Sequence, residues 1–106
     1  MTSQSLRILA LFLDQPDVPV FGLELVRESN LKSGTVYPIL ARFEETGWVE
    51  SRWEAEDPNS LGRPRRRLYR LTGVGEREAR AAIDEQIKAL SGGVRAPLAR
   101  GGLQTT

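Results

Sequence analysis

The chain has 106 residues, and its 15 Lys+Arg against 14 Asp+Glu give a net charge of +1. This length allows one domain with one small core. The sequence contains no His and no Cys, which excludes disulfides, thiol nucleophiles, imidazole catalysis and the zinc, haem and iron–sulfur sites that need these ligands. We therefore expect neither a metal nor a cofactor.

An apolar run, Leu6 to Leu13, lies near the start of the chain. It is too short to cross a bilayer, which takes roughly 20 residues. Serines rather than basic residues precede it and acidic residues follow it, unlike a secretory signal. We therefore expect a cytoplasmic protein with no membrane partner.

The same run predicts a first helix, capped by Ser3 or Ser5 and ended by Pro16. It carries two apolar stripes, one of Leu6, Leu9, Ala10 and Leu13, the other of Ile8, Leu11 and Phe12. A helix that is apolar nearly all round must be covered on two sides. A second copy of the chain is the favoured cover for the second stripe, and a central position within one chain is the alternative.

Two further helices follow a short extended element around Pro19. The first begins near Phe21 and is closed by Asn30. The second lies within residues 33–46 and places Val36, Ile39, Leu40 and Phe43 on one face. Because proline has no N–H to donate, Pro38 favours Thr35 as the N-cap of this helix, whereas a start at Ser33 would imply a distorted first turn.

From Trp48 the apolar period changes to two, which predicts a strand with Val49, Ser51, Trp53 and Ala55 on one side and Glu50, Arg52, Glu54 and Glu56 on the other. Turn-forming residues fill 57–64, and residues 65–71 predict the returning strand. Thr72 can cap a last helix whose apolar stripe is Ala79, Ile83, Ile87 and Leu90, and which Gly92 and Gly93 would end.

This order of elements is that of a winged helix-turn-helix: mainly α with a small β-hairpin wing and one C-terminal dimerisation helix. We assign residues 1–72 to a DNA-binding domain, 73–91 to the dimerisation helix and 92–106 to a disordered tail. In this fold the third helix can lie in the major groove of double-stranded DNA, while the hairpin reaches the flanking backbone or minor groove.

Arginines are concentrated in the hairpin, where they fill five of the eight positions from Arg63 to Arg70, and no acid occurs from 58 to 75. Guanidinium groups suit phosphates and narrow minor grooves. We assign Arg63, Arg65 and Arg66 to DNA binding. Arg67 and Arg70 are left open between DNA and cross-strand pairing with the glutamates of the first strand.

The outward face of the third helix supplies the remaining DNA-binding candidates. Thr35 and Pro38 can contact base edges, and Lys32 and Arg42 can contact phosphates. Ser33 and Gly34 allow a close approach of the backbone. Tyr37 has two interpretations, as a base or phosphate contact or as a flanking aromatic whose hydroxyl faces water.

Four segments taken together resemble the PadR family of bacterial transcriptional regulators: Phe21-Gly22-Leu23-Glu24-Leu25, Ser33-Gly34-Thr35-Val36-Tyr37-Pro38-Ile39-Leu40, Phe43-Glu44-Glu45-Thr46-Gly47-Trp48-Val49, and Gly62-Arg63-Pro64-Arg65-Arg66-Arg67-Leu68-Tyr69-Arg70-Leu71-Thr72. The resemblance covers roughly residues 6–90. It implies a homodimer that binds operator DNA, usually as a repressor, with the last helix supplying much of the dimer contact. It also implies that Thr35, Tyr37 and Pro38 face the groove.

The dimer interface is therefore expected to use Ile8, Leu11, Phe12, Ala79, Ile83, Ile87 and Leu90. Some short relatives hold planar effectors between aromatic residues of the last helix, whereas the stripe here is aliphatic, so a small-molecule effector stays unidentified. Two rival functions are a winged-helix module that binds protein without DNA, and an enzyme using Glu44 and Glu45. Those two acids are adjacent on a helix and point in different directions, which is typical of solvated surface.

Overall fold

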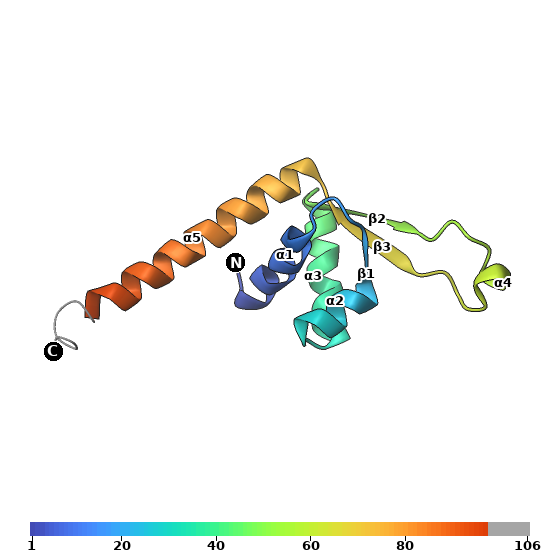
Figure 1. The fold of residues 1–106 in the computed structure, drawn as a ribbon, viewed down its shortest axis with the longest axis horizontal. Coiled ribbons are helices and arrows are strands. Elements are labelled where there is room, and N and C mark those ends of the chain that lie inside the picture. Colours follow the sequence, from blue (N-terminus) through green and yellow to red (C-terminus); the bar gives the residue numbers. More distant parts are fainter. Residues whose placement is uncertain (98–106) are drawn as a thin grey trace.

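The computed structural model describes residues 1–97, which form five helices and a three-stranded antiparallel sheet (Figure 1). The helices are α1 (Ser3–Asp14), α2 (Gly22–Ser29), α3 (Ser33–Glu45), α4 (Pro58–Leu61) and α5 (Gly73–Pro97). The strands are β1 (Val20–Phe21), β2 (Val49–Trp53) and β3 (Arg67–Leu71), in the order β1-β3-β2. The predicted winged helix-turn-helix fold is confirmed.

Helix α1 lies at the centre of the core. Ile8 is 0% exposed and Phe12 is 2% exposed within a single chain, packed in one cluster with Val36 and Leu40 of α3. Helices α2 and α5 both contact α1. The cover that we expected from a second copy is thus supplied to Ile8 and Phe12 by the chain's own helices, as in the alternative. Of the three assigned residues on α1, Leu11 alone remains half-buried.

The starts of α1 and α3 differ from the predicted ones. Thr2, rather than Ser3 or Ser5, caps α1, because its hydroxyl oxygen accepts the Ser5 N–H at 3.0 Å. Helix α3 begins at Ser33 after an N-cap at Lys32, so the favoured N-cap at Thr35 is wrong and Pro38 lies inside the helix. Pro38 cannot donate a backbone hydrogen bond to the carbonyl of Gly34, four residues earlier. Both residues are solvent-exposed, so this carbonyl is not left without a donor in the core.

The wing is the hairpin of β2 and β3 together with the loop between them. Its strands pair from Val49 opposite Leu71 to Trp53 opposite Arg67. The loop contains the short helix α4, which the sequence did not reveal among its turn-forming residues. Asp57 caps it by accepting the Asn59 N–H at 3.0 Å.

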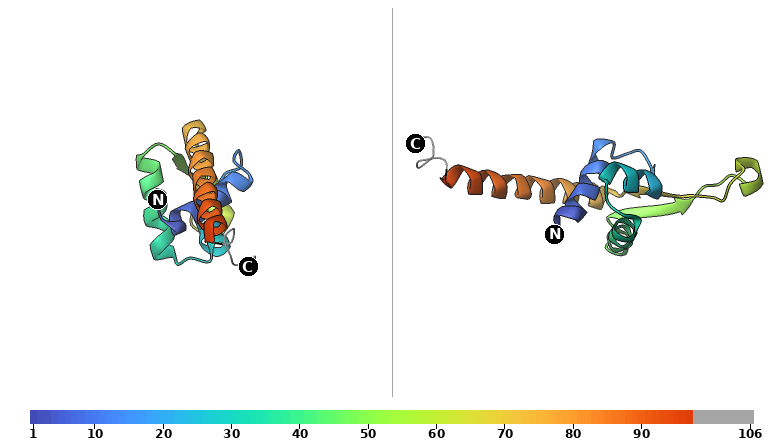
Figure 2. Two further views of the ribbon diagram at one scale, coloured as in Figure 1. Left: turned by 90° about the vertical axis from the view of Figure 1, so that its left-hand side faces the viewer. Right: turned by 90° about the horizontal axis from the view of Figure 1, so that it is seen from below.

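Helix α5 begins at a close backbone approach and then projects from the rest of the fold (Figure 2). The predicted cap is confirmed, since the Thr72 hydroxyl accepts the Gly75 N–H at 3.0 Å. A Cβ at Gly75 would lie 1.9 Å from the Trp48 carbonyl oxygen, so only glycine fits there. The helix does not end at Gly92 and Gly93 but continues to Pro97. Glycine lowers helix stability by about 1 kcal/mol without forbidding the conformation. The rest of the predicted tail, 98–106, lies outside the described residues.

No helix in the described part of the chain has both the length and the apolar character needed to cross a membrane.

Candidate nucleic-acid interface

The outward face of α3 has the composition that the sequence predicted. Tyr37 is 41% exposed, Thr35 is half-buried, and the remaining candidates are exposed: Lys32, Ser33, Gly34, Pro38 and Arg42. Because Pro38 has no N–H, the Gly34 carbonyl has no helical donor at the usual position. The first turns of α3 thus present small side chains and a free backbone acceptor at the surface.

Tyr37 is held in place by a contact with α2. A Cβ at Gly22 would lie 2.7 Å from the Tyr37 ring, so the absence of a side chain there lets the ring rest on the start of α2. The ring is therefore packed along one edge while two fifths of the residue stays exposed. The hydroxyl oxygen belongs to the packed edge, since it would lie 2.9 Å from the same Cβ, and both interpretations of Tyr37 stay open for the exposed part of the residue.

A groove of about 410 Å³ joins α3 to the wing. Its lining contains four aromatic side chains, three arginines and no acid: Phe21, Gly22, Leu23, Tyr37, Trp53, Arg65, Arg66, Arg67 and Tyr69. Burial raises the pKa of the Tyr69 hydroxyl, partly offset by the neighbouring Arg67 charge, so this group stays neutral near pH 7. Tyr37 of α3 and the basic side of the wing thus share one groove.

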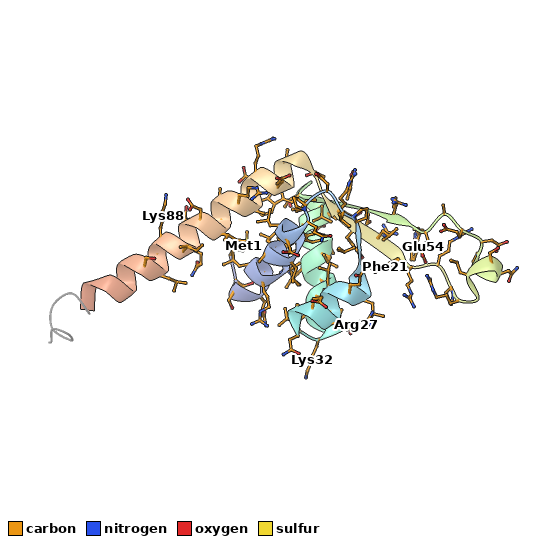
Figure 3. The ribbon with its side chains drawn as sticks, in the orientation of Figure 1. Met1, Phe21, Arg27, Lys32, Glu54 and Lys88 are labelled. Atoms are coloured by element: carbon orange, nitrogen blue, oxygen red, sulfur yellow. The ribbon has the colours of Figure 1, made fainter. Side chains whose placement is uncertain are left out.

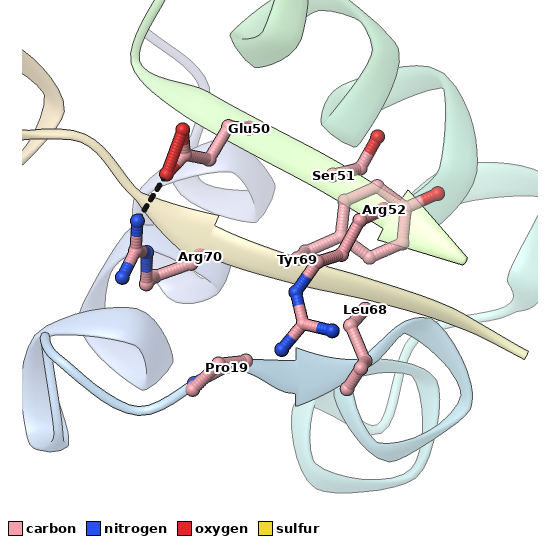
Figure 4. A pocket seen from close by; sticks show the side chains of 7 residues that line it. All are labelled: Pro19, Glu50, Ser51, Arg52, Leu68, Tyr69 and Arg70. Carbon is pink, nitrogen blue, oxygen red and sulfur yellow. Dashed lines mark hydrogen bonds and ion pairs between the residues drawn. The ribbon is translucent and has the colours of Figure 1, made fainter. Parts of the chain in front are cut away.

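Three of the wing arginines have acidic partners. Arg63 pairs with Glu54 at 2.6 Å, and Arg70 forms an ion pair with Glu50 across the two strands (Figure 4). Arg67 lies 3.8 Å from a Glu44 oxygen. The cross-strand pairing that was left open for Arg70 is therefore present, and it raises the pKa of the Arg70 guanidinium.

The Arg67 side chain also contacts two residues of β2. Its Nε donates to the Ser51 hydroxyl at 3.0 Å, and its guanidinium stacks 4.9 Å from the centre of the Trp53 ring. Glu44 accepts the Ser51 hydroxyl at 2.7 Å. Glu44, which the enzyme hypothesis invoked, thus joins α3 to the wing.

Three arginines of the wing, Arg52, Arg65 and Arg66, have no carboxylate partner within the described residues. Arg65 donates its Nε to the backbone carbonyl of Glu56 at 2.8 Å, which leaves its terminal nitrogens unused. Arg66 lies over the Phe21 ring, 5.7 Å from its centre. Arg65 and Arg66 line the groove beside α3 and Arg52 does not, so these two are the unpaired cations that the wing presents on that side.

Glu54 is the residue of this region whose burial the sequence did not reveal. Alternation placed it on one side of the strand with Glu50, among the glutamates that could pair with wing arginines, but it did not distinguish the exposed Glu50 from Glu54, which is 9% exposed. The hydrogen bond from Arg63 lowers its pKa from 4.5 to about 2, against an opposing effect of burial and helped by the Arg66 N–H. No periodicity could reveal this, because β2 ends at Trp53 and the loop folds over the next residue. Its partner Arg63, assigned to DNA, therefore has a structural contact of its own.

The candidate dimer residues of α5 change in exposure along the helix. Ala79 is 0% exposed and Ile83 is half-buried against the core, whereas Ile87 and Leu90 are 57% and 58% exposed. Leu13 of α1, Ile83 and Ile87 line a shallow hollow of about 490 Å³ together with Arg80, Ala81 and Asp84. The apolar stripe thus continues beyond the point where the chain covers it.

Comparison with known proteins agrees with this architecture. The model of the transcriptional regulator PadR-like family matches residues 17–81, which is more than half of the chain. The chain belongs to this family. Its function is therefore the regulation of transcription through DNA binding. The protein resembles a PadR-family regulator from Eggerthella lenta, with 27% identity, a TM-score of 0.65, and coverage of 89% of this chain and 83% of that one.

Two more distant structures show the same fold. A PadR-like transcription factor from Bacteroides fragilis is 24% identical, with a TM-score of 0.66 and coverage of 87% of this chain and 86% of that one. PadR from Bacillus subtilis, solved with operator DNA, is 19% identical, with a TM-score of 0.63 and coverage of 78% of this chain and 48% of that one. A search of curated proteins gave no match.

Proposed function

We propose that this PadR-like protein is a homodimeric repressor in the cytoplasm that binds an inverted-repeat operator. The observation that carries the proposal is the acid-free groove shared by Tyr37 of α3 and by Arg65 and Arg66 of the wing. A surface on which a helix and a basic hairpin meet can follow a DNA backbone on both sides of a major groove.

Helix α3 supplies the base contacts in this proposal. Thr35 offers a hydroxyl and a methyl group, Pro38 an apolar surface for a thymine methyl, and the Gly34 carbonyl an acceptor for a base amino group. Ser33 and Gly34 are small enough to let the backbone approach the DNA. Lys32 and Arg42 contact phosphates on either side and set the register of the helix.

The wing supplies further phosphate contacts. Arg65 and Arg66 are exposed and carry unneutralised charge, so each can displace a counterion from DNA. Arg63 is assigned to the shape of the wing loop instead, because Glu54 accepts two of its N–H groups. The DNA-binding set is thus revised at this position.

A second copy of the chain is the proposed cover for the outer half of α5. Fully burying a leucine or isoleucine is worth about 1.5–3 kcal/mol, so leaving Ile87 and Leu90 in water on both copies forgoes a large association energy. A helix of 25 residues is roughly 37 Å long, and every residue of it from Asp84 to Gly92 is exposed. Two such helices packed together would seal the stripe and place two α3 helices on one side of the dimer.

The proposal predicts two half-sites about one helical turn apart, roughly 34 Å. Repression follows from steric exclusion of the transcription machinery at such a site. Selection of bound sequences from a random DNA pool, followed by sizing of the complex, tests operator and stoichiometry together. Enrichment of an inverted repeat bound by two chains is expected. Recovery of no consensus, or binding that is insensitive to salt, would contradict the proposal.

A further inference from the structure

Glu54 is the one buried acid among the described residues, and it lies in the basic wing. It follows directly after the last residue of β2, at the point where the two strands separate into the loop. Figure 3 places it on the wing, well beyond the core helices. A buried carboxylate in a surface hairpin needs a physical reason, since burial of a charge is unfavourable unless the charge is paired and hydrogen-bonded.

Three donors converge on this carboxylate from the far side of the loop. Arg63 donates to Oε1 at 2.6 Å and to Oε2 at 3.1 Å, and the Arg66 backbone N–H donates to Oε1 at 2.8 Å. The Glu54 N–H in turn donates to the Arg66 carbonyl at 3.0 Å. One residue thus closes the loop of residues 55–65 through both its backbone and its side chain.

The consequence concerns the arginines that are free to contact DNA. Arg66 is fixed at its backbone by Glu54, and Arg65 lies between the two residues that Glu54 holds. A loop of this length without such contacts would have to be ordered when DNA binds, and that ordering would lower the affinity. A closed loop offers both guanidinium groups already in place beside Tyr37.

We propose that Glu54 is a positioning residue for DNA binding, which with Arg63 forms a latch that holds Arg65 and Arg66 on the α3 side of the wing. The proposal rests on the proposed function, because the arginines that the latch positions are the ones assigned to phosphate there. It gives a carboxylate a favourable role in binding a polyanion.

That role reverses the sign expected from charge alone. Removing a negative charge from a DNA-binding surface strengthens binding when the charge acts only through its repulsion of phosphate. Removing the latch weakens binding, because the amide NH₂ of a glutamine side chain would face a guanidinium N–H that needs an acceptor. Glu56 provides the matched control, since it is an exposed acid of the same wing whose carboxylate has no hydrogen bond among the described residues.

The experiment compares Glu54→Gln and Glu56→Gln with the unaltered chain on the selected operator across a range of salt concentrations. For Glu54→Gln we expect binding weaker by about tenfold or more, and a salt dependence smaller by about 1.8 in log K against log [salt] if one phosphate contact per wing is lost in a dimer. For Glu56→Gln we expect equal or tighter binding. Arg63→Lys, which keeps the charge but loses the two-pronged contact, should weaken binding as Glu54→Gln does.

A second measurement needs no DNA. Exchange of the Arg66 amide proton should accelerate in Glu54→Ala, which removes both carboxylate oxygens, while amides of α1 keep their protection and the melting temperature stays within a few degrees. Operator binding by Glu54→Gln that is equal to or tighter than that of the unaltered chain overturns the latch. So does an Arg66 amide that exchanges as slowly in Glu54→Ala as in the unaltered chain. If the unaltered chain itself binds no operator, the proposed function fails, and the Arg66 amide still decides whether the latch orders the wing.

Discussion

Replacing Arg65 and Arg66 together by glutamine isolates the electrostatic contribution of the wing to operator binding. Both side chains are exposed, neither has a carboxylate partner in the described part of the chain, and both line the groove beside Tyr37. Neither side chain belongs to the core, so the substitution should change the charge presented to DNA and leave the fold intact.

The magnitude follows from the number of phosphate contacts. Two arginines on each of two wings give four contacts in the proposed dimer. Because each contact contributes about 0.9 to the slope of log K against log [salt], the double variant should lose about 3.6 from that slope. Between 50 and 200 mM salt the corresponding part of the affinity changes roughly 150-fold, so the defect should be largest at low salt.

Fluorescence anisotropy with labelled operator at several salt concentrations measures this slope. The control is Arg77→Gln, which removes an arginine charge from an exposed position on α5 outside the groove, and it should leave the slope nearly unchanged. An unaltered slope in the wing variant would show that these arginines do not contact phosphate. A lower affinity with the same slope would assign the effect to altered shape rather than to charge.

Three further outcomes test the helices and the wing. Ile87→Glu should weaken self-association at least about 100-fold, because it places a charge where the dimer needs an apolar contact, and sedimentation equilibrium will show whether the dimer persists. Gly75→Ala should lower the free energy of unfolding by about 2 kcal/mol or more through the clash with Trp48, whereas Gly92→Ala, with nothing within 4 Å, should raise it by up to about 1 kcal/mol in urea titrations. The carboxyl of Glu54 should titrate near its lowered pKa of about 2 by NMR, so its stabilising contribution is complete above pH 4.5 and is lost as the pH falls toward 2; a midpoint near 4.5 would refute the paired state.

Periodicity predicted most of the elements because burial alone decides them. The inward positions of α3, such as Val36 and Leu40, recur at helical spacing and are fully buried, and the change to a period of two at Trp48 marks the start of β2. The sequence also predicted the end of a helix correctly where a single residue type determines it. Asn30 closes α2 in the left-handed conformation, which asparagine tolerates better than most residues.

The sequence predictions were wrong where contacts with other parts of the chain overrode a local preference. Pro38 argued for a late start of α3, but the helix begins earlier because the exposed turn can leave the Gly34 carbonyl to solvent. Ile8 and Phe12 were assigned to a partner because their stripe was counted on an isolated helix. The sequence could not show that α2, α3 and α5 together surround α1.

In the wing, the number of arginines in the sequence differs from the number whose charge is available to DNA. Arg63, Arg67 and Arg70 each lie near a glutamate, so a large part of their charge is used to shape the hairpin and to join it to α3. Arg65 and Arg66 keep theirs. Acids in a DNA-binding wing therefore need not oppose binding, because an ion pair that fixes the loop lowers the ordering cost for the arginines beside it. A chain with a net charge of +1 can thus present a basic interface, provided that its acids pair with arginines away from the DNA and do not line the surface that faces it.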